Sequence, residues 1–119
     1  MTQIVKVKSG SIFEEKASYS RLVAVDNWIY VSNTAGRNPD TKLIPEDVIE
    51  QAEQVFANIE RALAAVDASL ADVVCSRVFI QDPADVAKVM DYIGTRFRGI
   101  DPACTCLLYT SDAADDMQC

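Results

Sequence analysis

Cys104 is the side chain in this sequence with the clearest potential for chemistry. It follows Asp101-Pro102-Ala103, at the start of an apolar run that ends at Tyr109. A cysteine attacks as its thiolate, and a nearby cation such as Arg21 or Arg77 would favour that form. The chain has 0 histidines to act as a base, so we favour the alternative, in which Cys104 is a small residue lining a pocket or the core.

The other cysteines form no recognisable metal or redox motif. Cys75, Cys104, Cys106 and Cys119 include no Cys-x-x-Cys pair, and zinc sites built with histidine are excluded by composition. Ser-His and Cys-His catalytic pairs are excluded in the same way. The sequence therefore predicts no metal and no other cofactor, and it places Cys75, in the middle of an apolar run, in the core.

Length and charge narrow the class of protein further. A chain of 119 residues that is 50% hydrophobic predicts one globular domain with a real core. The net charge of −7 argues against nucleic-acid binding, because few cations are present to displace phosphate counterions. The sequence shows neither an apolar leader nor a run of membrane-spanning length, so we expect a cytoplasmic protein with reduced thiols and no membrane partner.

The elements that would position these residues follow from hydrophobic periodicity and turn chemistry. Residues 12–19 have poor periodicity and are predicted as a loop, and residues 33–45 as another. The predicted elements, in chain order, are an edge strand at 4–7, a hairpin of 21–25 and 28–32 around Asp26-Asn27, a helix that begins at Pro45-Glu46-Asp47, a strand at 73–81, a helix from Asp82-Pro83 to Phe97, and a strand entered at Pro102.

This order predicts an α+β fold, with one mixed sheet and both helices packed on one of its faces. The apolar stripe of the long helix, which includes Val55, Phe56 and Leu63, is interpreted as core. A sheet covered on one side leaves its other face in need of a partner, so we expect the chain to associate with copies of itself.

Four segments resemble the RidA-like family of reactive-intermediate, or imine, deaminases. They are Gly10-Ser-x-Phe-Glu with Ala-x-Tyr19-Ser-Arg, the hairpin end Tyr30-Val-Ser32, the passage from Ala68 to Asp82, and the residues from Phe97 to Ala103. The resemblance runs from about Ser9 to about Cys106. It implies a chorismate-mutase-like fold, a homotrimer with small-molecule clefts between subunits, and no metal or organic cofactor.

The resemblance also implies a reaction, the hydrolysis of enamines and imines such as 2-aminoacrylate to a keto acid and ammonia. The family places an arginine after Pro-Ala and a glutamate in a later Val-Glu-Ile-like run; here Cys104 takes the arginine position, and no such run follows. The ligand-binding residues that it implies are Tyr19, Ser32, Asn33, Met90 and Cys104. The catalytic residues stay unassigned.

Two hypotheses about function remain: a hydrolase whose substrate needs no arginine, and a trimer that binds small metabolites without turnover. Nuclease activity, also attached to the family, is disfavoured by the negative charge.

Three charged residues deserve separate predictions. Glu14 or Glu15 could supply the missing acid, although we favour the alternative that both are solvated loop residues. Arg77, inside a predicted strand, either pairs with a carboxylate across a subunit interface or points toward the cleft, and the pairing is favoured.

The segment from about Cys106 to Cys119 continues no earlier pattern. It resembles one reading frame of a transposase-type sequencing adapter, translated as though it were coding sequence. We therefore predict a truncated RidA-like domain at 1–105, a non-native tail at 106–119, and a missing last strand. The alternative is a genuine acidic tail of the kind common at chain ends.

Overall fold

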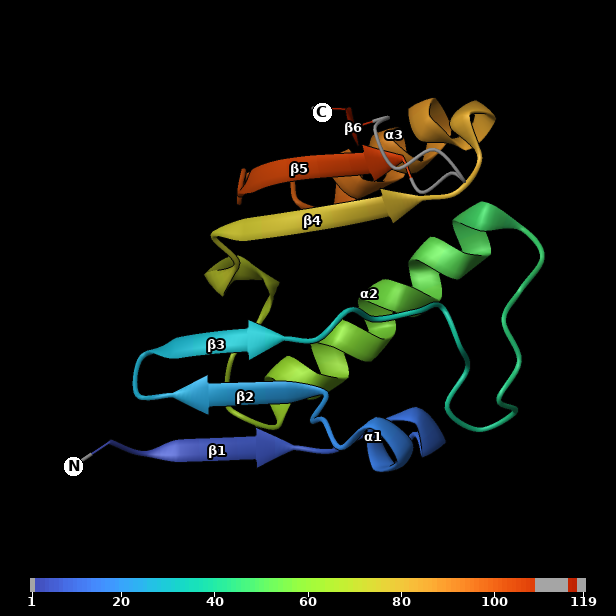
Figure 1. The fold of residues 1–119 in the computed structure, drawn as a ribbon. Helices are drawn as coiled ribbons and strands as arrows, with labels where there is room; N and C mark the ends of the chain where they lie inside the picture. The colour runs from blue at the N-terminus through green and yellow to red at the C-terminus, as the bar shows by residue number, and fades with distance from the viewer. Residues whose placement is uncertain (1, 109–115, 118–119) are drawn as a thin grey trace. The chain divides into compact units, whose positions relative to one another are not determined.

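The computed structural model of the chain describes residues 2–108 and 116–117 (Figure 1). The chain divides into two compact units, Met1–Ser69 and Leu70–Cys119. The first contains three strands and two helices, and the second contains three strands, one α-helix and two short 3-10 helices. The predicted α+β class is confirmed.

The first unit is built on an antiparallel sheet with the order β1-β2-β3. Its strands are β1 (Ile4–Val7), β2 (Leu22–Val25) and β3 (Trp28–Val31), as the edge strand and hairpin predicted. Asp26, at the hairpin turn, has a φ of 51°, a left-handed conformation that aspartate tolerates better than most residues.

The two faces of this sheet differ in exposure. Leu22 is fully buried on one face. The register Ile4–Val25–Trp28 runs across the other face, which also carries Tyr30. Trp28 is 65% exposed and Tyr30 is 63% exposed. An apolar sheet face is thus open to solvent in the single chain, as the sequence predicted.

Residues 12–19 contradict the prediction of a loop, because they contain a short helix, α1 (Ile12–Ala17). The hydroxyl of Ser11 accepts a hydrogen bond from the Phe13 amide at 3.2 Å, which caps the helix N-terminus. Ser18 ends the helix with a φ of 58°. Six residues are too few to show helical periodicity, so capping decides the local structure.

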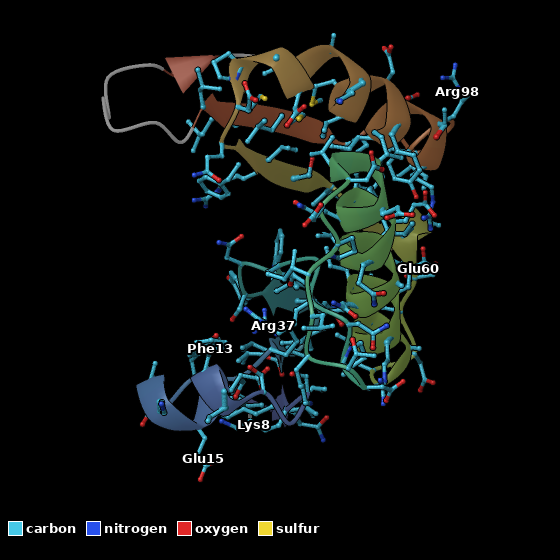
Figure 2. All side chains as sticks on the ribbon, turned by 90° about the vertical axis from the view of Figure 1, so that its right-hand side faces the viewer. Lys8, Phe13, Glu15, Arg37, Glu60 and Arg98 are labelled. Carbon is cyan, nitrogen blue, oxygen red and sulfur yellow. The ribbon has the colours of Figure 1, made fainter. Side chains whose placement is uncertain are left out.

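The long helix α2 (Val48–Ala64) was predicted, but it begins directly after Pro45-Glu46-Asp47 rather than at Pro45. Asp47 is its N-cap and accepts a hydrogen bond from the Glu50 amide at 3.0 Å. Its buried residues are Phe56, Ala62 and Leu63, which agrees with the predicted apolar stripe. In Figures 1 and 2 the helix runs alongside the β1–β3 sheet.

The loop between β3 and α2 is fastened to this helix. The Asn58 amide donates hydrogen bonds to the backbone oxygens of Ala35 at 3.2 Å and Arg37 at 2.9 Å. Between them, a Cβ placed on Gly36 would lie 2.5 Å from the Gln51 backbone oxygen, so only glycine fits this approach without movement. The segment that follows Ser32 is therefore held in one path.

The second unit contains a mixed sheet, with β4 and β5 parallel and β5 and β6 antiparallel. Its elements are η1 (Leu70–Asp72), β4 (Cys75–Ile80), η2 (Pro83–Asp85), α3 (Val86–Arg96), β5 (Ala103–Leu108) and β6 (Asp116–Met117). Asp82 accepts a hydrogen bond from the Ala84 amide at 2.9 Å and caps η2, whereas the Asp-Pro signal predicted the start of the second helix, which begins at Val86. The buried hydrophobic residues of this unit come from β4, β5 and α3: they are Ile80, Cys106, Val89 and Ile93.

Two predictions need correction here. Where the sequence predicted one mixed sheet, the described strands pair as two three-stranded sheets, β1-β2-β3 and β4-β5-β6. Cys75 is exposed, because it lies on the face of β4 opposite to buried Ile80. Asp116–Met117, within the predicted tail, pairs with Cys106 and Leu107, and the absence of the family's own last strand stays a prediction.

The predicted boundary at residue 105 stays a prediction. β5 continues to Leu108, and Cys106 within it is 2% exposed. Most of the predicted tail, residues 109–115 and 118–119, lies outside the described residues. Within the described ranges, none of the helices has the length and apolar character to cross a membrane.

Candidate ligand site

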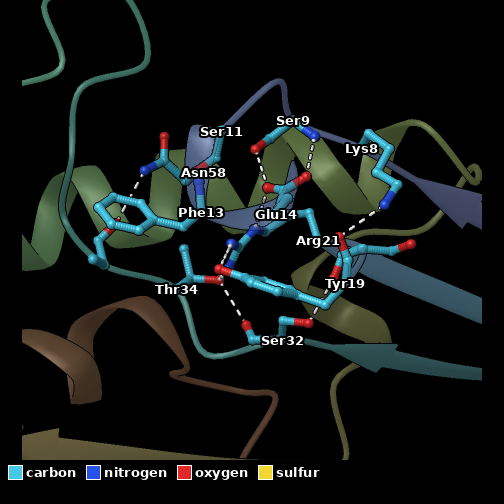
Figure 3. A network of polar contacts seen from close by, with 12 residues as sticks. Lys8, Ser9, Ser11, Phe13, Glu14, Tyr19, Arg21, Ser32, Thr34 and Asn58 are labelled. Atoms are coloured by element: carbon cyan, nitrogen blue, oxygen red, sulfur yellow. Dashed lines mark hydrogen bonds and ion pairs between the residues drawn. The ribbon is translucent and has the colours of Figure 1, made fainter. Parts of the chain in front are cut away.

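The guanidinium of Arg21 organises the polar cluster of the first unit (Figure 3). Arg21 directly precedes β2, and its backbone amide donates to the Val7 oxygen at 2.9 Å. Its side chain is only 11% exposed and forms an ion pair with Glu14, with 3.2 Å between Nε and Oε2. The strand start thus fixes the arginine, and α1 supplies its counter-ion.

Glu14 is buried, so the predicted solvated-loop interpretation is wrong for this residue. It is 2% exposed, and it accepts hydrogen bonds from the Ser9 amide at 2.9 Å and from the Ser9 hydroxyl. Burial raises the pKa of the Glu14 carboxyl, but the Ser9 hydrogen bonds and Arg21 outweigh it and hold this pKa below its ordinary value. Glu15, the neighbouring residue, is exposed as predicted.

The other nitrogens of Arg21 reach the predicted ligand-binding residues. Nη1 donates to the Asn33 backbone oxygen at 2.6 Å and to the Thr34 hydroxyl at 3.2 Å. Nη2 donates to the Tyr19 hydroxyl at 3.4 Å, and the guanidinium lies 5.5 Å from the centroid of the Tyr19 ring. One arginine therefore links the end of α1 to the segment after β3.

Ser32 extends the same cluster. Its hydroxyl donates to the Ser20 backbone oxygen at 2.6 Å, and the Ser32 backbone oxygen accepts from the Thr34 hydroxyl at 2.8 Å. The structure thus brings together Tyr19, Ser32 and Asn33, three of the five residues predicted to bind a ligand. Tyr19 and Ser32 are half-buried, and Asn33 is exposed.

Met90 and Cys104, the remaining two, belong to the second unit. Met90 lies in α3 and Cys104 in β5, and both are half-buried. Cys104 pairs in register with Ser76 of β4, whose hydroxyl is buried and has no hydrogen-bond partner among the residues that the structure describes. Arg77, next along β4, is exposed, and its predicted roles stay predictions.

The Glu14–Arg21 pair is the feature that sequence reasoning missed. The spacing Ser11-x-x-Glu14 matches a helix capping box and could have indicated the start of α1, although it does not indicate that Glu14 is buried against Arg21. In the part of the chain that is described, no group of three or more histidine, cysteine or acidic residues is arranged to hold a metal ion.

Comparison with known proteins shows the family to which this chain belongs. Residues 10–111 match the sequence pattern of a family described as endoribonuclease L-PSP. The chain belongs to this family, the RidA-like family that its motifs resemble.

Related sequences agree. The mitochondrial protein Mmf1 of Saccharomyces cerevisiae is 34% identical over 91 residues, 76% of this chain and 63% of its own length. A 2-iminobutanoate/2-iminopropanoate deaminase of Mus musculus is 35% identical over 86 residues, 71% of this chain and 64% of its own length. The chain thus spans less than two thirds of each of these two relatives.

Solved structures show the same fold. Rv2704 of Mycobacterium tuberculosis, described as a member of the YjgF/YER057c/UK114 family, superposes with a TM-score of 0.81 at 29% identity, covering 94% of this chain and 89% of that one. RidA of the Antarctic bacterium Psychrobacter superposes with a TM-score of 0.77 at 28% identity, covering 94% and 87%.

Proposed function

We propose that this chain binds small reactive imines or enamines in clefts between the subunits of a homotrimer and hydrolyses them to a carbonyl compound and ammonia. The observation that carries the proposal is that the Arg21 guanidinium, which is only 11% exposed, contacts both the Tyr19 hydroxyl and the Asn33 backbone oxygen. Ser32 joins the same cluster through the Thr34 hydroxyl. The family relationship supports the chemistry, because relatives about one-third identical are named 2-iminobutanoate/2-iminopropanoate deaminases.

The proposed reaction needs water and proton transfer but no redox partner. The oxygen of water bonds to the imine carbon, the carbon–nitrogen bond breaks, and both water hydrogens leave on nitrogen as ammonia. The Tyr19 hydroxyl is suited to donate a hydrogen bond to the nitrogen or to the developing oxygen. An acid that transfers the water proton is not assigned.

The substrate class follows from the charges. A carboxylate on the substrate would need a bidentate arginine, and Cys104 stands where the family pattern has that arginine. Arg21 is no substitute, because Glu14 already neutralises it at 3.2 Å. We therefore propose an uncharged imine or enamine as the substrate.

A second function is favoured by the same substitution. Without the arginine, and with Glu14 engaged by Ser9 and Arg21, the chain could hold a metabolite without turning it over. A structural relative, TdcF of E. coli, was solved with bound serine, at 25% identity and a TM-score of 0.73. The alternative is a non-catalytic trimer that binds small metabolites.

Assembly and location belong to the proposal as well. The exposed Trp28 and Tyr30 on the open face of β1–β3 support burial of this face against another copy. A cytoplasmic location stays a prediction, and one relative is named mitochondrial. We propose no RNA substrate, because the net charge of −7 opposes contact with phosphates.

One experiment separates the two functions. A flavin amine oxidase converts butylamine to butan-1-imine in situ, and ammonia release is followed with and without the chain in a buffer that contains no other amine able to displace ammonia from the imine. Acceleration that falls in a Tyr19→Phe variant supports the hydrolase. No acceleration, together with binding of 2-oxobutanamide by ligand-observed NMR, supports the binding protein. Absence of both contradicts the proposal.

A further inference from the structure

We propose that Glu14 and Arg21 form a positioning pair that orients the Tyr19 hydroxyl as a hydrogen-bond donor to the bound ligand. The inference rests on the proposed ligand site, but it does not require hydrolysis. It assigns a role to Glu14, which touches no predicted ligand-binding side chain directly and acts through Arg21.

The direction of one hydrogen bond carries the inference. A guanidinium has only N–H donors and no acceptor, so the 3.4 Å contact between Arg21 Nη2 and Tyr19 Oη must be donated by the arginine. The phenol oxygen is then an acceptor in this contact, and its own hydrogen points elsewhere. Among the residues that the structure describes, no acceptor takes that hydrogen, which leaves it available to a ligand atom.

Glu14 is what holds the guanidinium in place. Its carboxylate accepts from Arg21 Nε and from both the amide and hydroxyl of Ser9, so its position is set from two sides. Three fixed partners of the arginine, Glu14, the Asn33 oxygen and the Thr34 hydroxyl, determine where Nη2 points. In Figure 3 the Tyr19 ring lies beside this guanidinium, at the end of the path from Glu14.

The pair also keeps the site close to neutral. The charge of Arg21 is balanced by a carboxylate that is 2% exposed. A ligand therefore meets a hydrogen-bond donor without meeting an unpaired cation. This arrangement suits a carbonyl oxygen or an imine nitrogen better than a carboxylate.

A double-mutant cycle tests the inference in the full chain. The probe is 2-oxobutanamide, an uncharged carbonyl compound, and its dissociation constant is measured by ligand-observed NMR. The variants are Glu14→Gln, Tyr19→Phe and the two combined, with Glu15→Gln as the matched control, because Glu15 is exposed on the same helix (Figure 2). Loss of one hydrogen bond corresponds to an affinity about 3- to 10-fold weaker.

We expect Tyr19→Phe and Glu14→Gln each to weaken binding, the double variant to be no weaker than Tyr19→Phe, and Glu15→Gln to bind as wild type. Additive losses would overturn the inference, because a purely structural effect of Glu14 does not depend on the Tyr19 hydroxyl. Unchanged binding in Glu14→Gln, or no binding by the wild type, would overturn it too. If Glu14→Gln does not fold, Arg21→Lys replaces it in the cycle with the same expected outcome. Wild-type binding without acceleration of ammonia release over the spontaneous rate would refute the hydrolase and leave this inference standing.

Discussion

Replacing Glu14 by alanine is the most informative change to the stability of the first unit. The substitution removes the only charged partner of Arg21 within the described residues and leaves the amide and hydroxyl of Ser9 without their carboxylate acceptor. Because Glu14 is 2% exposed, water cannot freely replace these contacts.

The expected cost follows from the burial and from the contacts that survive. Removing one partner of a buried ion pair costs about 3–5 kcal/mol in the free energy of unfolding. Arg21 keeps the Asn33 oxygen and the Thr34 hydroxyl as acceptors and is 11% exposed. We therefore expect the lower end of the range, about 3 kcal/mol.

Urea unfolding followed by circular dichroism at neutral pH measures this loss. With a slope of about 2 kcal/mol per molar urea, the midpoint should fall by about 1.5 M. Glu15→Ala is the control and should leave the midpoint almost unchanged, because this neighbour is exposed. A Glu14→Ala midpoint indistinguishable from the control would refute the view that the buried pair stabilises the unit.

Further predictions follow from the same structure. The pKa of Glu14 is lower in the folded than in the unfolded chain, so the stabilisation that Glu14 contributes is complete above the unfolded-state pKa and is lost as pH falls through the folded-state pKa. In urea titrations, Glu14→Gln should therefore lose less stability than wild type between about pH 5 and pH 3. An equal loss in the two proteins would contradict this prediction. Gly36→Ala should cost about 1–3 kcal/mol in the same assay, since its Cβ would lie 2.5 Å from the Gln51 oxygen. Gly94→Ala, whose Cβ has its nearest neighbour at 3.9 Å, is the control and should be neutral or stabilising. Trp28→Glu should lower the oligomer mass measured by light scattering, because it places a charge on the open face of the β1–β3 sheet. Leu43→Glu, at a loop position that is 69% exposed, should leave the mass unchanged. Equal masses for the two variants would argue against the open face as the interface.

The sequence predicted elements well where local chemistry is decisive. The Asp26-Asn27 turn needs only neighbouring residues and was found where expected. The starts of α2 and α3 were predicted only to within a few residues, because Asp47 rather than Pro45 begins α2 and Asp82 caps a short 3-10 helix before α3. The α1 helix was missed because it is too short for periodicity and depends on one capping serine. The exposure of Cys75 was missed because a strand with mixed apolar residues does not reveal which face is covered.

The residues of the candidate site could be predicted from the sequence, but the Glu14–Arg21 pair that holds them could not. Tyr19, Ser32 and Asn33 were named from the family resemblance. In the structure the Tyr19 hydroxyl and the Asn33 backbone oxygen contact the Arg21 guanidinium, and Ser32 joins them through the Thr34 hydroxyl. Nothing in the sequence indicated that Glu14 would be buried while Glu15 is exposed, because that difference arises from the long-range contact with Arg21. A local sequence pattern does not indicate which residues distant in sequence will contact each other in the folded chain.

The central claim, that this family member hydrolyses uncharged imines, is tested most directly by comparing two substrates. Butan-1-imine and 2-iminobutanoate are generated in situ from butylamine and 2-aminobutanoate by flavin oxidases, and catalysed ammonia release is measured for each against the spontaneous rate. The account predicts acceleration for butan-1-imine that exceeds the acceleration for 2-iminobutanoate by about 10-fold or more, the discrimination expected when a carboxylate has no paired arginine. Equal or greater acceleration of the carboxylate-bearing substrate would contradict it.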